Sequence, residues 1–271
     1  MTARWITPLL FSLLFCSTPT HADPFQSAVD AYNAGNKQEA FLLFKSLAEQ
    51  GNASAQYNLG FMYANGDGVP EDDKEAVAWF RKAAEQGDAT AQSNLGAMYS
   101  NGDGVPEDDK EAVAWFRKAV EQGDAMAQYN LGFMYDNGNG VPEDDKEAVA
   151  WYRKAAEQGN ANAQSNLGVM YDNGNGVPED DREAVAWFRK AAEQGNANAQ
   201  SNLALMYDDG DGVPEDDVLA YLWWNMAGAN GNEIAAKNRA ILSKQMTPAQ
   251  IERAQDLSRK CFAQNYKNCG M

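Results

Sequence analysis

One block of 36 residues recurs along most of this 271-residue chain, and its copies follow one another without insertion or deletion. The five copies occupy 53–88, 89–124, 125–160, 161–196 and 197–232. A period between about 20 and 50 residues is typical of stacked supersecondary units, each of which buries its apolar side against its neighbours. The repeat therefore predicts one elongated domain of stacked units.

Each copy divides into two predicted helices, and the first of these, helix A, is expected at about 53–64 in the first copy. Asn52 is its expected N-cap. Helical spacing gives the helix a buried face. That face consists of Ala55, Leu59, Met62 and Tyr63. Gly60 weakens a helix, so we expect another helix to approach closely at this point.

Helix B follows a loop, 65–70, whose two glycines allow positive φ and whose proline stops helix A from continuing. Asp72 is the expected N-cap of helix B, and Glu75 completes a capping-box pattern. The inner stripe of helix B is expected to be Ala76, Trp79, Phe80 and Ala83. The tryptophans of this stripe are predicted to pack in the core between adjacent units. They are Trp79, Trp115, Trp151 and Trp187.

This pattern resembles the Sel-one-like repeat, a branch of the tetratricopeptide superfamily. In the second copy the resemblance rests on Ala91, Leu95, Gly96, Met98, Tyr99, Gly102, Gly104, Val105, Pro106, Asp108, Ala112, Trp115, Ala119 and Gly123. It implies an all-α fold, a right-handed α-solenoid of stacked helix-turn-helix repeats with helix A on the concave side. It also implies an adaptor for protein complexes. Exported bacterial members of the family are associated with envelope processes and contact with host cells.

The ends of the chain depart from the repeat. Residues 23–52 are expected to form a helix pair without the glycine-rich loop, with Asp23 as N-cap and Pro24 in the first helical position. Residues 233–271 are expected to form two further helices that cover the unusually apolar last copy. Because a solenoid needs caps over its open ends, we interpret both segments as capping units.

The first 22 residues indicate a secretory signal peptide. Arg4 supplies the positive end, 5–15 is a short apolar run, and 20–22 is a small-residue cleavage site, so the mature chain is expected to start at Asp23. The run is too short to span a bilayer as a helix. Cys16 follows the bulky Phe15 and does not fit a lipoprotein box. The sequence predicts an exported protein, periplasmic or secreted.

Cleavage would leave two cysteines, Cys261 and Cys269, and no histidine. An even pair in an exported protein predicts a disulfide at the C-terminal end. The loss of histidine excludes catalytic triads and histidine metal sites. Paired acids such as Asp72 and Asp73 recur in every copy, which favours caps over an active site. The loops lack the ligand spacing of a calcium loop and the Lys-Ser/Thr ending of a phosphate loop. We therefore expect a non-enzymatic protein without cofactor or metal.

Acidic residues outnumber basic ones by 39 to 22, and the resulting net charge of −17 is spread over the repeats. Nucleic acid and anionic membrane surfaces would be repelled. We expect neither as a partner.

The copies differ within helix A at four positions, which a helical wheel places within about 80° on the side opposite the buried stripe. In the first copy they are Ser54, Tyr57, Phe61 and Ala64. An invariant asparagine stands at the edge of this strip. Exposed aromatic side chains beside amides suit an extended peptide. The predicted partner-binding residues are Tyr57, Asn58, Phe61, Asn94, Met126, Tyr129, Asn130, Phe133, Asn166, Val169, Asn202 and Leu205. Neutral variation on a tolerant surface explains the same pattern.

The leading hypothesis is an exported scaffold that binds a protein or peptide partner through the concave helix A face. One alternative is a β-lactam-binding or β-lactam-hydrolysing protein, as cysteine-rich relatives of the family are, although this chain has no cysteine in its repeats. A second alternative is a peptidoglycan-associated envelope protein. The partner's identity and the oligomeric state stay open.

Overall fold

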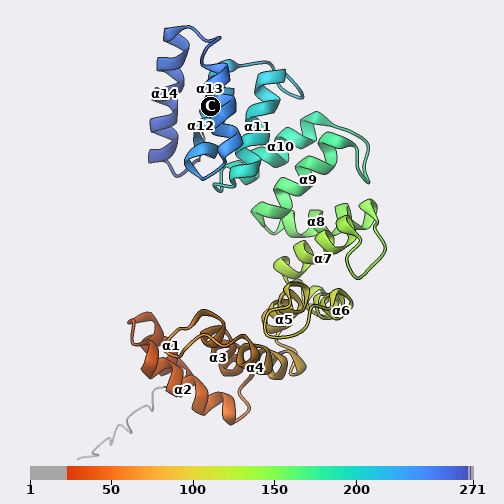
Figure 1. The fold of residues 1–271 in the computed structure, drawn as a ribbon, viewed down its shortest axis with the longest axis vertical. Coiled ribbons are helices and arrows are strands. Elements are labelled where there is room, and N and C mark those ends of the chain that lie inside the picture. Colours follow the sequence, from red (N-terminus) through yellow and green to blue (C-terminus); the bar gives the residue numbers. More distant parts are fainter. Residues whose placement is uncertain (1–22, 268, 270–271) are drawn as a thin grey trace, which may run out of the picture.

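The computed structural model describes residues 23–267 and 269, and the described chain is a stack of paired helices (Figure 1). The first pair is α1 (Pro24–Asn33) and α2 (Lys37–Glu49). The five repeats supply α3 (Ala53–Asn65) and α4 (Asp73–Glu85), α5 (Ala89–Asn101) and α6 (Asp109–Val120), α7 (Ala125–Asn137) and α8 (Asp145–Glu157), α9 (Ala161–Asn173) and α10 (Asp181–Ala192), and α11 (Ala197–Asp209) and α12 (Asp217–Ala229). The last pair is α13 (Glu233–Leu242) and α14 (Pro248–Ala263). The predicted signal peptide, 1–22, lies outside the described residues.

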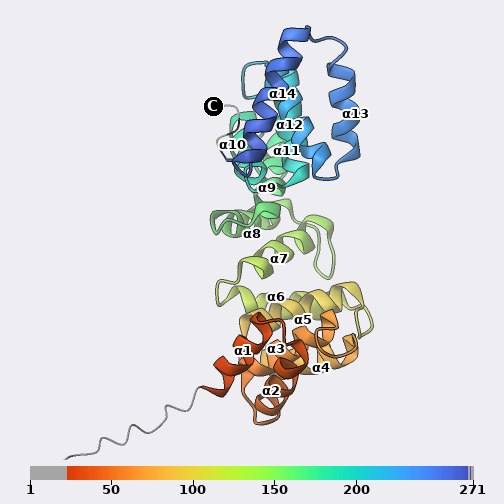
Figure 2. The ribbon, with the colours of Figure 1, turned by 90° about the vertical axis from the view of Figure 1, so that its left-hand side faces the viewer.

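The pairs follow one another in chain order from α1 and α2 at one end to α13 and α14 at the other, and the stack bends along its length (Figures 1 and 2). Among the helices of the five repeats, the alternate helices that approach each other most closely are helices A, namely α5 with α7 and α9 with α11. Helices on the inner side of a bent stack lie closer to one another than helices on its outer side, so the helices A lie on the inner side. The all-α solenoid is confirmed, and no helix of residues 23–267 is long and apolar enough to cross a membrane.

The helix ends form largely as predicted. The Asn52 side chain accepts a hydrogen bond from the backbone N–H of Ala55 at 2.8 Å, and Asp72 accepts from the N–H groups of Lys74 and Glu75. The predicted capping box at Asp72 is wrong. Its backbone N–H donates to the carbonyl of Tyr63 at 3.0 Å, which leaves no donor for the Glu75 carboxylate.

Glycines mark two close approaches. A Cβ placed on Gly60 would lie 2.8 Å from the ring of Phe80, so the expected approach is confirmed and its partner is helix B of the same copy. Gly104 has a φ of +69°, and a Cβ there would lie 2.4 Å from the carbonyl of Asp73. Each glycine-rich loop therefore rests on the start of helix B in the preceding copy.

The tryptophans of helix B are half-buried, so their predicted burial in the core is wrong in degree. Trp79 and Trp115 each pack one side against the core that the preceding helix B forms with the helix A of their own copy. The ammonium groups of Lys82 and Lys118 lie 3.6 Å from the ring centroids of Trp79 and Trp115. The fully buried aromatic is the next residue, as in Phe116, because a step of about 100° along a helix moves a side chain from the edge of a contact to its centre.

A buried glutamine in helix A ties successive pairs together. The Gln56 amide donates to the carbonyl of Ala48 in α2 at 3.1 Å and accepts from Gln86 at the end of α4 at 2.7 Å. The same bonds recur at Gln92 and Gln164. This network fixes how each pair sits on the one before it. It was not predicted from the sequence.

The C-terminal helices both pack on α12, which buries Trp223. The predicted disulfide between Cys261 and Cys269 is present, with the Cα atoms 5.1 Å apart. A capping box forms at the start of α14, where Thr247 and Gln250 exchange both hydrogen bonds. The apolar residues of α13 are only partly used in this contact: Leu242 is buried, whereas its neighbour Ile241 is exposed.

Candidate binding groove

The variable strip of helix A is exposed at two of its four positions. One is the position of Phe61, Phe133 and Leu205, and the other is the position of Met126; all four side chains are exposed as predicted. These residues come from α3, α7 and α11, and as equivalent positions of the repeat they face the same side of the stack; the counterparts of Phe61 in α5 and α9, Ala97 and Val169, are half-buried. We call this side the groove.

The predicted exposure of Tyr57 and Tyr129 is wrong. Both rings are half-buried, and their centroids lie 5.8 Å from Phe80 and 5.9 Å from Tyr152, respectively. The cause is Gly60 and its counterparts, because the missing side chain lets a helix B ring project under helix A. The residue one turn earlier then rests on that ring. Burial accordingly raises the pKa of Tyr57 and of Tyr129.

The invariant asparagines lie half-buried along the edge of the groove. The amide N–H₂ of Asn58 donates within its own helix, to the carbonyl of Ser54 at 2.7 Å. The predicted row is Asn58, Asn94, Asn130, Asn166 and Asn202. Its binding role stays a prediction.

A hollow of about 250 Å³ opens between α5 and α7, and we call it the α5/α7 hollow. Phe116 and Met134 line it together with Tyr129, Asn130 and Phe133 from the predicted set. It forms beside Ala97, which stands where the first and third copies carry Phe61 and Phe133.

A more polar hollow of about 430 Å³ lies across α9, α11 and α13. Asn166, Val169, Asn202 and Leu205 of the predicted set line it. Ser165, Asn198 and Ser201, which stand at the variable positions of helix A, also line it. Its remaining residues lie in or beside α13 and were not predicted from the sequence; they are Asn232, Ile234 and Asn238.

The groove extends one unit beyond its predicted end because α13 keeps the helix A register. Asn238 follows Asn202 by 36 residues, and Ile241 follows Leu205 by the same interval. A third hollow of about 220 Å³, the α11/α13 hollow, includes Leu205, Asp208 and Ile241. Extending the asparagine spacing into residues 233–242 would have revealed this end of the groove.

Five predicted residues lie in helices A but outside these three hollows. They are Tyr57, Asn58, Phe61, Asn94 and Met126. The structure therefore brings the predicted set together in the third, fourth and fifth copies more than in the first two.

Carboxylates follow the groove edge in its C-terminal half at Asp136, Asp172 and Asp208. Burial is the largest cause of a raised pKa at each, and neighbouring carboxylates add to it. At Asp136 a hydrogen bond from the Tyr152 hydroxyl, 3.0 Å long, opposes the rise. This half of the groove therefore concentrates negative charge.

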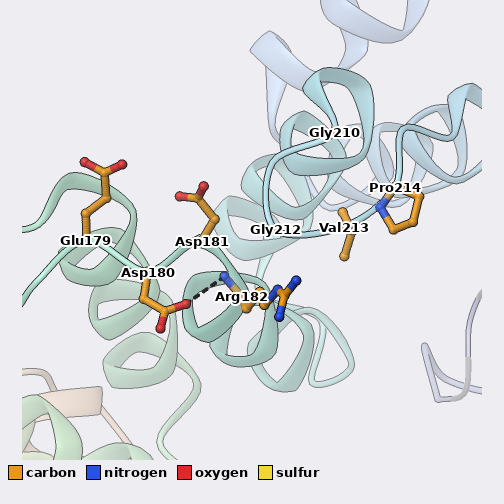
Figure 3. Close-up of a pocket in the computed structure, with 8 residues that line it drawn as sticks. All are labelled: Glu179, Asp180, Asp181, Arg182, Gly210, Gly212, Val213 and Pro214. Atoms are coloured by element: carbon orange, nitrogen blue, oxygen red, sulfur yellow. Dashed lines mark hydrogen bonds between the residues drawn. The ribbon is translucent and has the colours of Figure 1, made fainter.

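A further hollow, of about 530 Å³, lies on the loop side between the start of α10 and the next glycine-rich loop (Figure 3). Its acids serve the helix end: Asp180 accepts from the backbone N–H of Arg182 at 3.1 Å. The backbone of Gly212 packs against the Asp181 carbonyl, where a Cβ would lie 2.4 Å from the oxygen. No group of three or more metal-ligating side chains occurs in the described chain. This hollow is a contact between repeats.

Comparison with known proteins gives one family. The Sel1 repeat model matches 33–52, 53–88, 89–124, 125–160, 161–196 and 197–232. A Sel1 repeat protein from Oxalobacter formigenes of known structure is 36% identical, with a TM-score of 0.77, over 86% of this chain and 97% of that chain.

A second solved structure is c5321, a protective antigen of uropathogenic Escherichia coli strains with the SLR fold. It is 31% identical, with a TM-score of 0.60, over 91% of this chain and 62% of that chain. A curated relative, an exopolysaccharide production negative regulator from Rhizobium leguminosarum bv. viciae, is 42% identical over 53 residues. That match spans only 20% of each protein.

Proposed function

We propose that this chain, which belongs to the Sel1 repeat family, is an exported scaffold that holds an extended segment of a partner protein in its groove. Sel1 repeat proteins are scaffolds that typically mediate protein–protein interaction. We propose more specifically that the partner binds to the helix A face, that it binds as an extended segment, and that it does so outside the cytoplasm. The partner itself is unidentified.

The observation that carries the proposal is where the exposed apolar side chains stand. Most large exposed apolar residues of the described chain occupy two positions of helix A. These are Met126 and Ile234 at one position, and Phe61, Phe133, Leu205 and Ile241 at the other. Scattered exposed apolar residues need no explanation, but a row of them on one face indicates an interaction surface. Leu42 and Phe262 are the exceptions off the groove.

The shape and polarity of the groove favour an extended segment. Hollows recur along the helix A face, so a chain lying along the stack could place side chains in several of them. Half-buried asparagines beside the hollows can both donate to and accept from a peptide backbone. The helices A present this surface already folded, which lowers the entropic cost of binding.

Affinity capture from the envelope fraction of the source cells tests the groove. The bait is the mature protein, and its variant is Phe133→Ser with Leu205→Ser. We expect the variant to lose the captured partner while its far-ultraviolet circular dichroism is unchanged, because both side chains are exposed. Leu42→Ser is the matched control, since Leu42 is 62% exposed but stands in α2. Equal capture by parent and groove variant would count against the proposal.

Export rests on two observations, the signal-like segment at 1–22 and the disulfide at the C-terminal end. Disulfides persist in oxidising compartments. Cell fractionation followed by mass spectrometry should find the chain outside the cytoplasm, beginning at Asp23. An uncleaved chain in the cytoplasm, with both thiols open to alkylation, would refute this part of the proposal.

No observation favours the two alternative functions. The repeats have no cysteines, and the two that the structure describes are joined to each other. Binding to β-lactams or to peptidoglycan therefore stays a prediction without structural support.

A further inference from the structure

The α5/α7 and α11/α13 hollows occupy the same place in the repeat, three copies of 36 residues apart. Ser100 corresponds to Asp208, Phe116 to Trp224, and Phe133 to Ile241. The chain thus contains two versions of one hollow. The differences between them show what the second has gained.

The α11/α13 hollow has gained a hydrogen-bond donor and a charge. Trp224 is 3% exposed, and its indole Nε1–H has no hydrogen-bond partner in the described chain. The Asp208 carboxylate takes part in no ion pair among residues 23–267. Buried polar groups are nearly always partnered, so this unpartnered donor, buried on a residue that lines the hollow, indicates a missing acceptor.

The third copy shows that these two positions can satisfy each other. There the counterparts are Tyr152 and Asp136, and the tyrosine hydroxyl donates to the carboxylate at 3.0 Å. At Trp224 and Asp208 the same two positions make no such bond. The donor and the acceptor of the α11/α13 hollow are both left for another group.

We propose that the α11/α13 hollow binds a lysine or arginine side chain of the extended partner segment, which rests on the function proposed above. The aliphatic stem packs between Leu205 and Ile241, as such stems do on apolar surface. The charged head meets Asp208. Because the indole N–H of Trp224 is buried in the free chain, it donates to a main-chain carbonyl of the same segment only once the side chains at the wall of the hollow move aside.

The charge around Asp208 supports a cationic occupant. Burial raises the pKa of the Asp208 carboxyl, and the nearby acids Asp209, Asp217 and Glu215 raise it further. A cation from the partner relieves this repulsion between like charges. The α5/α7 hollow, with Ser100 in place of the acid, suits an uncharged apolar side chain.

Selection from a displayed library of random twelve-residue peptides tests the subsite. The baits are the mature parent, Asp208→Ser and Ala97→Phe. Each variant uses a residue that another copy carries at that position, Ser100 and Phe61, so the fold should accept it. We expect parent-selected peptides to share one basic and one apolar position. Asp208→Ser should lose only the basic preference, and Ala97→Phe only the apolar one.

The outcomes separate the two proposals. Peptides that bind as well to Phe133→Ser with Leu205→Ser as to the parent, or no selection at all, would overturn the groove and the subsite with it. Peptides that depend on the groove but show no basic preference would overturn the subsite alone.

One selected peptide then provides a quantitative test by fluorescence anisotropy. Replacing its basic residue by glutamine should weaken binding to the parent about tenfold and leave binding to Asp208→Ser unchanged. The affinity difference between the two peptides for the parent should shrink at high salt. Trp224→Phe, which matches Phe116, should weaken both peptides by the same factor. Equal affinity of the two peptides for the parent would refute the charge pair.

Discussion

The groove and the packing contacts within and between units, which we call the junctions, are built from neighbouring residues of the same helices. The junction residues are nearly constant among the copies, whereas the groove residues vary. At the junctions, the helix B aromatic, the helix A glycine beneath which it lies and the buried glutamine are nearly the same in all five copies. In the groove, the exposed positions change from copy to copy. A residue that must fit its own repeat has little freedom, because every copy presents the same surroundings.

The contrast indicates which kind of variation carries information. A phenylalanine at a junction, such as Phe116, is 1% exposed and fits against Gly96. Phe133 in the groove is 41% exposed and touches no such partner. Its bulk is not required by packing, since the same position holds Ala97 in the second copy. Any requirement for an aromatic ring there must come from outside the chain.

The largest expected effect separates these two phenylalanines. Phe116→Ala should lower the free energy of unfolding by about 3–5 kcal/mol, since it leaves a cavity in the core. Phe133→Ala should lower it by less than about 1 kcal/mol, because exposed substitutions away from special features change little. Urea denaturation followed by circular dichroism measures both. Similar losses from the two variants would mean that the groove residue is also structural.

The second prediction concerns the glutamine network. Gln164→Ala removes two hydrogen bonds, one to the carbonyl of Ala156 and one from the amide of Gln194, each worth about 0.5–1.5 kcal/mol. Both groups keep a second partner, the N–H of Gly159 and the carbonyl of Lys190, so we expect a total loss of about 1–3 kcal/mol. The control is Gln26→Ala, whose exposed amide bonds only Asp30. If the two variants unfold at the same urea concentration, the network does not hold the pairs together.

The third prediction tests the edge of the junction. Trp115→Ala should cost only about 1–2 kcal/mol, because the ring is half-buried and the apolar area it hides is correspondingly small. Part of that loss is the contact with Lys118, worth about 0.5–1 kcal/mol at an exposed site. Trp115→Ala measured beside Phe116→Ala ranks the edge against the centre. A larger loss at Trp115 would reverse the assignment.

The repeat, its two helices and most helix ends could be predicted from the sequence because they depend on local spacing, caps and glycines. The exposure of Phe61 and Phe133 could also be predicted, since an angle around one helix is enough to place them. The exposure of Tyr57 was predicted wrongly because its burial depends on the ring of Phe80, which reaches from helix B to lie against Gly60. A helical wheel contains no such neighbour.

The last prediction concerns Asp136, whose bond to Tyr152 joins the groove to a junction. Burial raises the folded-state pKa of Asp136 above its ordinary 3.8, the Tyr152 hydroxyl opposes the rise, and Asp145 adds to it. The folded chain then holds this proton more tightly than the unfolded chain does. This contribution to stability is greatest below pH 3.8 and is lost as the pH rises through the raised pKa.

Asp136→Asn should therefore be slightly more stable than the parent at pH 7, with the advantage vanishing in acid, because the amide oxygen still accepts from Tyr152. Urea midpoints from pH 3 to pH 7 measure it. Tyr152→Phe, which the neighbouring copies tolerate as Phe116 and Phe188, removes the donor that favours the charged carboxylate and should steepen the parent's pH dependence. A flatter profile for Tyr152→Phe would show that the hydroxyl, and not burial, controls this carboxyl.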